Sequence, residues 1–273
     1  MTIDFKALGA AVAAENNIDM TKAQVRTELP PLAAGPCRLR FVGYVELGKQ
    51  NDSYQGKPVV KEKVRLFFEV LGKKHPPRIT SDGKEIPNVI SFEENFSLNE
   101  KANFFKLFNR MNYAGDAVHM VQLLGRAYKG EIVHREYDRK GGGKGVAVEL
   151  HSKERGYLID PPRIEDPETG DWRDVPVPPP TVPIKVFLWN KPSKEQWGSI
   201  FIDGVWPART DESGKVVKPE RSKNELQDAI RAAVNFKGSP IEVLLQGSEQ
   251  LDLPAAEKAK PKADPLDGLG DDE

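Results

Sequence analysis

The sequence predicts a mainly β fold with some α-helix, of the α+β class, in which a small five-stranded barrel carries a helix between its third and fourth strands. Two neighbouring segments alternate apolar residues with basic or aromatic ones, which is the period of a half-buried strand. A helical pattern then interrupts the strand-like segments, and two more of these follow it. At 273 residues the chain is long enough to bury a sizeable core.

The first two strands are expected at residues 38–46 and 61–71, joined by a turn-rich loop at residues 48–57. In each strand, the period of two places the large apolar residues on one face and the basic and aromatic residues on the other. Gly43, in the middle of the first strand, predicts a bulge or a sharp bend.

The third strand is expected at residues 89–96, and the clearest helix follows it. Ser97 and Glu100 have the spacing of a capping box, and apolar residues recur after them at helical intervals. A second, short helix is expected at residues 117–124.

The last two strands of the core are expected at residues 127–137 and 146–153, with a basic, glycine-rich turn between them. This order of elements matches the oligonucleotide-binding (OB) fold, with a C-terminal extension. The expected organisation is an N-terminal helical and linker segment (1–32), an OB-like core (33–160), a proline-rich connector (161–183), C-terminal strands and a helix that pack on the core (184–247), and a disordered acidic tail (248–273).

The charges are distributed unevenly, although the net charge is only −1. Residues 35–157 hold 22 Lys and Arg against 15 Asp and Glu, whereas residues 158–273 hold 15 against 22. This asymmetry is expected when one region binds phosphates and another mimics them.

Several classes of protein are excluded by the residues present. Cys37 is the only cysteine, so no disulfide framework or cysteine-based zinc site is expected, and a reducing cytoplasm is the natural compartment. The four histidines lack ligand spacing, and residues 141–145 do not form a phosphate-binding P-loop, because no Gly-Lys-Ser/Thr follows and strands flank the run. We therefore expect no metal, no cofactor and no enzymatic activity.

The polar faces of the predicted strands favour binding of single-stranded nucleic acid. Such proteins combine a basic groove for phosphates with exposed rings on which bases stack. The candidate nucleic-acid-binding residues are Arg38, Arg40, Tyr44, Lys49, Tyr54, Lys61, Lys63, Arg65, Phe67, Tyr128, Lys129, Arg135, Tyr137 and Lys144. An ordinary solvated sheet face is the alternative for each residue taken singly.

The C-terminal tip carries five acidic groups and no basic one, on a tether rich in alanine, lysine and proline. It has almost nothing apolar to bury, and it is suited to compete with nucleic acid or to recruit a partner protein. The candidate partner-binding residues are Asp264, Leu266, Asp267, Leu269, Asp271, Asp272 and Glu273.

The order of these features resembles a group of phage single-stranded DNA-binding and replication-accessory proteins with an OB-like core and an acidic C-terminus. The resemblance covers residues 33–205 and the tail. It is carried by short phrases at residues 44–48, 64–70, 123–126, 132–134, 186–190 and 197–202. It implies a viral protein of the bacterial cytoplasm that protects single-stranded DNA in replication and recombination. Its partners would be a DNA polymerase, a helicase-primase or an RNA polymerase, recruited through the tail.

The first functional expectation is thus a sequence-nonspecific single-stranded DNA-binding protein without enzymatic activity. The alternative is a transcription or replication cofactor that mainly binds a phage polymerase, with DNA contacts secondary. A nuclease or ligase barrel would need a metal-ligand cluster, which the sequence does not offer.

Overall fold

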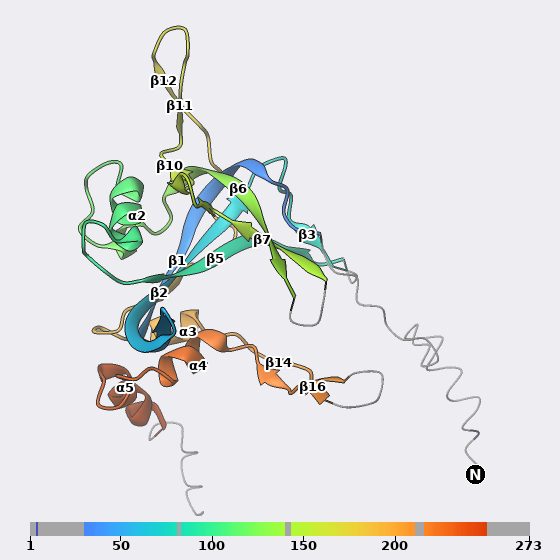
Figure 1. Ribbon diagram of the computed structural model, residues 1–273, viewed down its shortest axis with the longest axis vertical. Helices are drawn as coiled ribbons and strands as arrows, with labels where there is room; N and C mark the ends of the chain where they lie inside the picture. The colour runs from blue at the N-terminus through green and yellow to red at the C-terminus, as the bar shows by residue number, and fades with distance from the viewer. Residues whose placement is uncertain (1–3, 5–29, 81–82, 140–142, 211–215, 250–273) are drawn as a thin grey trace, which may run out of the picture. The chain divides into compact units, whose positions relative to one another are not determined.

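The computed structural model describes residues 4, 30–80, 83–139, 143–210 and 216–249 (Figure 1). The chain divides into two units, Met1–Pro31 and Leu32–Glu273, and the described helices and strands all belong to the second. This unit is mainly β with a few helices, which confirms the α+β class. None of the described helices is both long and apolar enough to cross a membrane.

One large sheet organises the unit, and its central strand is β1 (Gly35–Tyr54). Antiparallel partners lie on both sides of β1, namely β2 (Lys57–Leu71) and β6 (Ala127–Asp138). The sheet is extended by β5 (Asn88–Asn95) beside β2, by β7 (Lys144–Glu149) and β10 (Ile159–Asp160) beside β6, and by β13 (Lys185–Phe187), which runs parallel to β1.

Short hairpins and helices decorate this sheet. The two-stranded pairs are β3 (Arg78–Ile79) with β4 (Glu85–Ile86), β8 (His151–Ser152) with β9 (Gly156–Tyr157), β11 (Arg163–Glu165) with β12 (Trp172–Asp174), β14 (Val205–Trp206) with β17 (Arg221–Ser222), and β15 (Arg209–Thr210) with β16 (Val216–Lys218). The helices are α2 (Asn103–Met111), the 3-10 helix η1 (Met120–Leu123), α3 (Lys194–Ser199), α4 (Glu225–Arg231) and α5 (Pro240–Glu249).

The predicted bulge at Gly43 is confirmed, because the register between β1 and β2 shifts between Phe41 and Gly43 and again between Glu46 and Gly48. A bulge inserts an extra residue into one strand and turns the following side chains to the other face. β1 also continues to Tyr54, so the predicted loop at residues 48–57 is wrong apart from its end.

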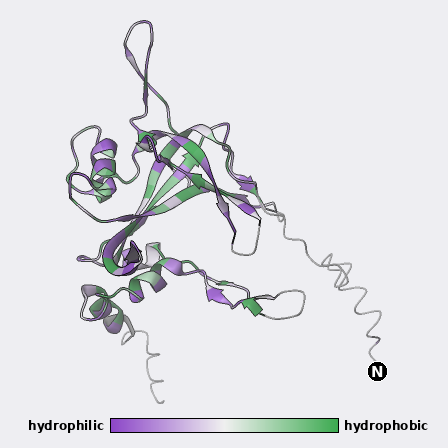
Figure 2. Ribbon diagram, viewed as in Figure 1, coloured by the Kyte–Doolittle hydropathy of each residue, from purple (hydrophilic) through white to green (hydrophobic). Residues whose placement is uncertain are grey.

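Both faces of the sheet are covered around Gly43, so two hydrophobic cores form. The first core contains Leu39, Phe41 and Tyr44 of β1 together with residues of β2, β5, α2 and β6. The second contains Val45 and Leu47 of β1 with residues of β13, α3, α4 and α5. Hydrophobic and hydrophilic residues alternate along the long strands in Figure 2, as a sheet with a buried face requires.

The sheet does not close on itself within the described residues. β5 pairs with β2 and β7 pairs with β6, but no pairing joins β5 to β7. The expectation of a closed five-stranded barrel is therefore not met, although its order of strand, strand, strand, helix, strand, strand is present.

The start of α2 differs from the one that the capping box at Ser97 and Glu100 predicts. α2 begins at Asn103, and its N-cap is Ala102, which makes no side-chain capping bond. Ser97 instead accepts a hydrogen bond from the Asn99 amide in the preceding turn, at 3.3 Å. A local turn therefore uses the serine hydroxyl that the sequence pattern assigns to the helix.

The proline-rich connector is fastened to the outer face of β1 and β2 by two neighbouring charged residues. Arg40 donates hydrogen bonds to the carbonyl oxygens of Val177, of Pro178 at 2.6 Å and of Gly125 at 2.9 Å. Glu69, which stands opposite Arg40 in the β1–β2 ladder, accepts hydrogen bonds from the amide and the hydroxyl of Thr181. The connector is thus a strap held by charge-assisted hydrogen bonds.

We predict that Arg40→Ala lowers the free energy of unfolding by about 2–3 kcal/mol, because it removes three hydrogen bonds from one charged group. Urea denaturation would measure the loss. Arg38→Ala is the matched control. The side chain of Arg38, the neighbouring outward arginine of β1, makes no hydrogen bond to any described residue, so a change within about 0.5 kcal/mol is expected. Equal losses in the two variants would show that the bonds from Arg40 to the connector do not stabilise the fold.

A second prediction concerns the bulge at Gly48, whose φ is +72°. A Cβ there would lie 2.2 Å from the Trp189 ring, so Gly48→Ala should cost about 3 kcal/mol or more through strain and steric overlap. At Gly56 the φ is similar, +76°, but a Cβ would meet nothing within 4 Å. Gly56→Ala should therefore cost only about 1 kcal/mol. Thermal unfolding of both variants tests the difference, and equal costs would place Trp189 elsewhere.

Candidate anion-binding pocket

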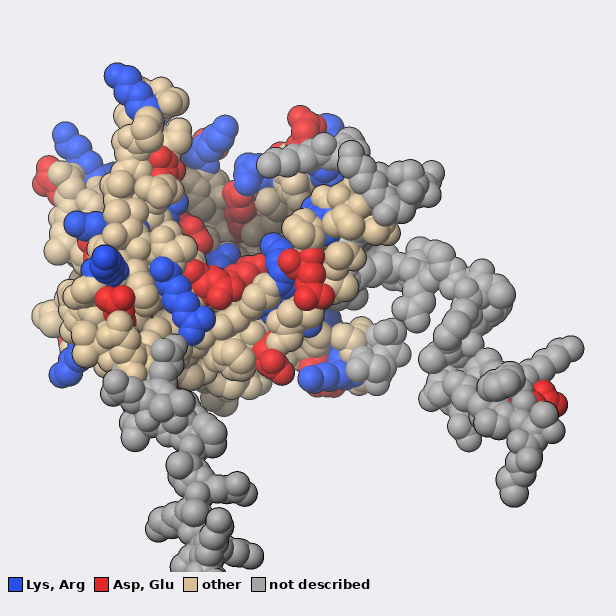
Figure 3. Space-filling view, turned by 90° about the horizontal axis from the view of Figure 1, so that it is seen from below, with Lys and Arg blue, Asp and Glu red and all other residues tan. Residues whose placement is uncertain are grey.

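The predicted nucleic-acid-binding residues do not form one continuous face. Some are buried, and the others fall into three groups along the sheet: the end of the β1–β2 hairpin, the β6–β7 hairpin, and a pocket beside the first residues of β1 and β6. On the face that Figure 3 shows, basic and acidic side chains are interspersed rather than separated. The charge asymmetry of the sequence therefore does not make this face uniformly basic.

Two of the predicted stacking rings are fully buried, and a third is partly buried. Tyr44 and Tyr128 are fully buried in the first core, and Phe67 packs against the second core. The bulge at Gly43 turns Tyr44 inward, and α2 covers Tyr128, whose hydroxyl donates to the Met111 carbonyl at 3.2 Å. The expected exposure is therefore wrong for Tyr44 and Tyr128. The alternation along the strands predicts an outer face for these rings but does not show that other segments cover it.

The two arginines that the sequence pattern pairs with these rings are also constrained. Arg40 is committed to the connector, as described above. The Nε atom of Arg65 lies 4.0 Å from Glu93 across the β2–β5 ladder, and it is buried without a hydrogen-bond partner. Arg40 is therefore a structural group in this fold rather than an available phosphate ligand.

The end of the β1–β2 hairpin carries four of the predicted residues around a single carboxylate. The ammonium groups of Lys61 and Lys63 each lie 3.3 Å from Asp52, and Lys61 also lies 5.8 Å from the centre of the exposed Tyr54 ring. Hydrogen bonds from the Ser53 amide and then from the lysines hold the pKa of Asp52 below its usual value. These lysines already have a counterion. The side chain of Lys49 is exposed nearby.

The β6–β7 hairpin carries the last three predicted residues in a similar state. Arg135 lies 2.7 Å from Glu149 across the ladder, and Lys144 lies 2.8 Å from Glu136. Tyr137 is 45% exposed. From Lys129 to Tyr137 the strand rises by roughly 26 Å at about 3.3 Å per residue, so this hairpin is separate from the pocket.

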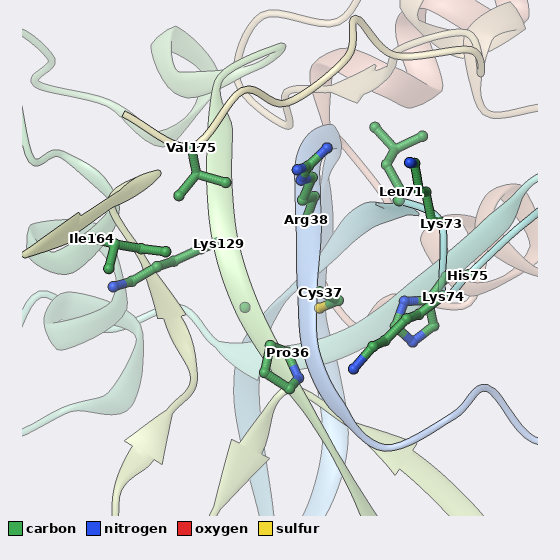
Figure 4. Close-up of a pocket in the computed structure, with 12 residues that line it drawn as sticks. Pro36, Cys37, Arg38, Leu71, Lys73, Lys74, His75, Lys129, Ile164 and Val175 are labelled. Carbon is green, nitrogen blue, oxygen red and sulfur yellow. The ribbon is translucent and has the colours of Figure 1, made fainter. Parts of the chain in front are cut away.

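Arg38 and Lys129 are the predicted residues that the fold brings together with unpaired charge. They stand opposite each other in the β1–β6 ladder and line a cavity of about 340 Å³. Lys73, Lys74 and His75, in the segment that follows β2, line its other side, and Ile164 and Val175 complete it from the region of the β11–β12 hairpin (Figure 4). The remaining lining residues are Pro36, Cys37, Leu71, Gly72 and Gly130.

The two lysines after β2 are held in place by a polar anchor beneath them. The Asn88 side chain donates to the carbonyl of Pro76 at 2.7 Å and accepts from Arg78 at 3.1 Å. The buried His75 ring is bonded through Nε2 to the Ala33 carbonyl at 3.0 Å. Because both ends of this segment are fixed, Lys73 and Lys74 project from a positioned backbone rather than from a free loop.

The charges of this pocket are unbalanced. None of Arg38, Lys73, Lys74 and Lys129 makes an ion pair or side-chain hydrogen bond with a described residue, and no Asp or Glu of the described chain lines the cavity. Arg38 and Lys129 are like charges directly opposite each other in a ladder, which is unfavourable. Asp160, which stands opposite Lys129 in the β10–β6 ladder, is ion-paired with Arg110. The arrangement is explained if an anion binds among these four cations.

Sequence reasoning missed two features near this pocket. Lys73 and Lys74 lie in a segment that the sequence pattern predicts to be an ordinary loop. Only the pairing of β1 with β2 brings them to the same cavity as Arg38. Trp172 lies in the predicted connector, where a turn with Asp166 and Gly170 is the signal for the β11–β12 hairpin. The Trp172 ring is 54% exposed, with the Arg163 guanidinium 4.7 Å from its centre.

The predicted partner-binding residues, which all fall within residues 264–273, lie outside the described part of the chain. Within that part, no group of three His, Cys, Asp or Glu side chains is placed to hold a metal ion.

Comparisons with known proteins found no matching family model, curated protein or solved structure.

One prediction concerns Cys37, which is buried at the base of the pocket. Burial, assisted by the Glu131 carboxylate, raises the pKa of the Cys37 thiol to about 12, so very little thiolate is present at pH 8. Alkylation by iodoacetamide should be at least about a hundredfold slower than for an unfolded cysteine. The rate should keep rising with pH beyond 9 instead of levelling there, and urea should restore normal reactivity. Fast alkylation of the native protein at pH 7 would contradict this burial.

Proposed function

We propose that this protein binds single-stranded nucleic acid without sequence specificity and without enzymatic activity, and that it uses the pocket around Arg38 and Lys129 to hold backbone phosphates. The observation that carries the proposal is the group of four unpaired cations in one cavity. Phosphate neutralisation by Lys and Arg, with release of counterions, supplies most of the affinity in nonspecific binding.

The other exposed basic residues would contribute less at each contact. Lys61, Lys63, Arg135 and Lys144 would have to exchange a carboxylate for a phosphate, since each already has an acidic partner. Arg38, Lys73, Lys74 and Lys129 would not. We therefore assign the pocket, and not the hairpin ends, as the primary phosphate site.

Exposed rings for base stacking lie away from the pocket. Tyr54 lies at the end of the β1–β2 hairpin, Tyr137 lies in the β6–β7 hairpin, and Trp172 lies in the β11–β12 hairpin. Since side chains alternate along a strand, Trp172 lies on the opposite face of its hairpin from Ile164, which lines the pocket. A nucleic acid that contacts both Trp172 and the pocket would have to pass around the β11–β12 hairpin. A flexible single strand can do this more easily than a duplex.

The fold supports this proposal at the level of architecture. We propose that β1, β2, β5, β6 and β7 correspond to the five strands of an OB-like barrel that is open between β5 and β7. The support is that β1 pairs with both β2 and β6 and that α2 lies between β5 and β6 in the chain. By the resemblance noted above, the protein would act in phage DNA replication or recombination in the host cytoplasm. The alternative, a cofactor that mainly binds a polymerase, rests on the tail.

The test is fluorescence anisotropy with labelled single-stranded and double-stranded oligonucleotides at several salt concentrations. If four cations neutralise phosphates, log K should fall against log salt with a slope of about −2.8, so affinity for the single strand drops about fiftyfold between 50 and 200 mM salt. Arg38→Ala combined with Lys129→Ala should halve the slope to about −1.4.

The matched control combines Lys101→Ala with Lys106→Ala. It removes the same charge from two exposed lysines that do not line the pocket. An equal loss in this control would show that only net charge matters. Absence of single-strand binding at low salt, or an unchanged slope in the pocket variant, would refute the proposed site.

A further inference from the structure

A second cavity, also of about 340 Å³, lies between β5 and β7. Among the described residues, β5 is paired only on the side of β2 and β7 only on the side of β6. The two strands therefore present edges with unpaired backbone groups toward the same space. We call this space, lined by residues of β5, β7, Asn103, Leu150, His151 and Tyr157, the edge slot. Unpaired edges are ready templates for another strand.

The strand directions fit the insertion of one extended segment. β5 is antiparallel to β2, which is antiparallel to β1, so β5 runs in the direction of β1. β7 also runs in the direction of β1, because it is antiparallel to β6. A segment running the opposite way between β5 and β7 would be antiparallel to both neighbours, which is the more stable pairing.

The edge slot has an apolar inner layer and an acidic outer layer. Along β5, Ile90 and Phe92 belong to the first core, whereas Ser91 and Glu93 are exposed. On the other side of the slot, Val148, Leu150 and Tyr157 face the same core. Glu149 alternates with Val148 and Leu150, so it belongs to the outer layer.

The charge of the slot selects the kind of segment that fits. Glu93, Glu94 and Glu149 line it, and no Lys or Arg of the described chain does. Glu94 is engaged with the Tyr157 hydroxyl in the inner layer. In the outer layer, the Glu93 carboxylate lies 4.0 Å from Arg65, and the Glu149 carboxylate is ion-paired with Arg135 at 2.7 Å. Carboxylate oxygens thus remain for a cation brought by a ligand.

We propose that the edge slot binds an extended segment of a partner protein in which apolar residues alternate with Lys or Arg. Its apolar side chains would complete the inner layer, its cations would meet Glu93 and Glu149, and its backbone would pair with both strand edges. Residues 1–31 of this chain are a poorer match, because they hold four acidic residues against three basic ones. This inference is independent of the phosphate pocket.

The test uses the full chain and a fluorescent synthetic peptide of alternating lysine and valine, titrated by anisotropy. A peptide with the same composition in blocks, Lys-Lys-Val-Val, is the control for charge without alternation. We expect the alternating peptide to bind at least about tenfold more tightly than the blocked one. Hydrogen exchange should slow in β5 and β7 when the peptide is bound.

Glu93→Gln combined with Glu149→Gln should weaken peptide binding about tenfold, while Glu100→Gln combined with Glu168→Gln, two exposed acids outside the slot, should leave it unchanged. Arg38→Ala combined with Lys129→Ala should leave peptide binding intact, which separates this site from the phosphate pocket. Equal binding of both peptides, no protection of β5 and β7, or protection of these strands by self-association without peptide would overturn the proposal.

Discussion

At Gly43 the alternation of side chains along β1 shifts, and the residues after the bulge contribute to both hydrophobic cores. The rest of the described fold depends on this shift. Before the bulge, Leu39 and Phe41 enter the first core; after it, Tyr44 still enters that core while Val45 enters the second. A single strand therefore joins the central sheet to the C-terminal helices. The close approach of Trp189 to Gly48, at the second register shift, fastens this junction.

Because both faces of β1 are buried, some expectations from the sequence are confirmed and others are wrong. The order of the five long strands and the helix follows from local patterns, because each pattern reports one element's own period. The bulge at Gly43 was also readable. The burial of Tyr44 was not predicted, because strict alternation along the strand ignores the extra residue that a bulge inserts. Phe67 and Arg40 were misassigned for a related reason. What covers the outer face of β1 and β2 comes from segments more than one hundred residues away, namely the strap and the C-terminal helices.

The candidate site illustrates the same limit. The sequence identified Arg38 and Lys129 by residue type, but the ladder of β1 with β6 makes them neighbours, and the anchored segment after β2 adds Lys73 and Lys74. Residue type alone did not separate these cations from Lys61, Lys63 and Arg135, which have carboxylate partners. The distinction between a paired and an unpaired cation is a property of the fold. It decides where an incoming phosphate gains most, because an unpaired cation exchanges no existing ion pair.

We propose that a nucleic-acid backbone passes through the pocket between β1, β6 and the segment after β2. A crystal structure of the full chain with a short oligothymidylate tests this most directly. We expect a phosphate group within ion-pair distance of both Arg38 and Lys129, with the proline-rich strap still bound to Arg40 and Glu69. Oligonucleotide bound elsewhere on the sheet, with the pocket cations facing solvent, would contradict it.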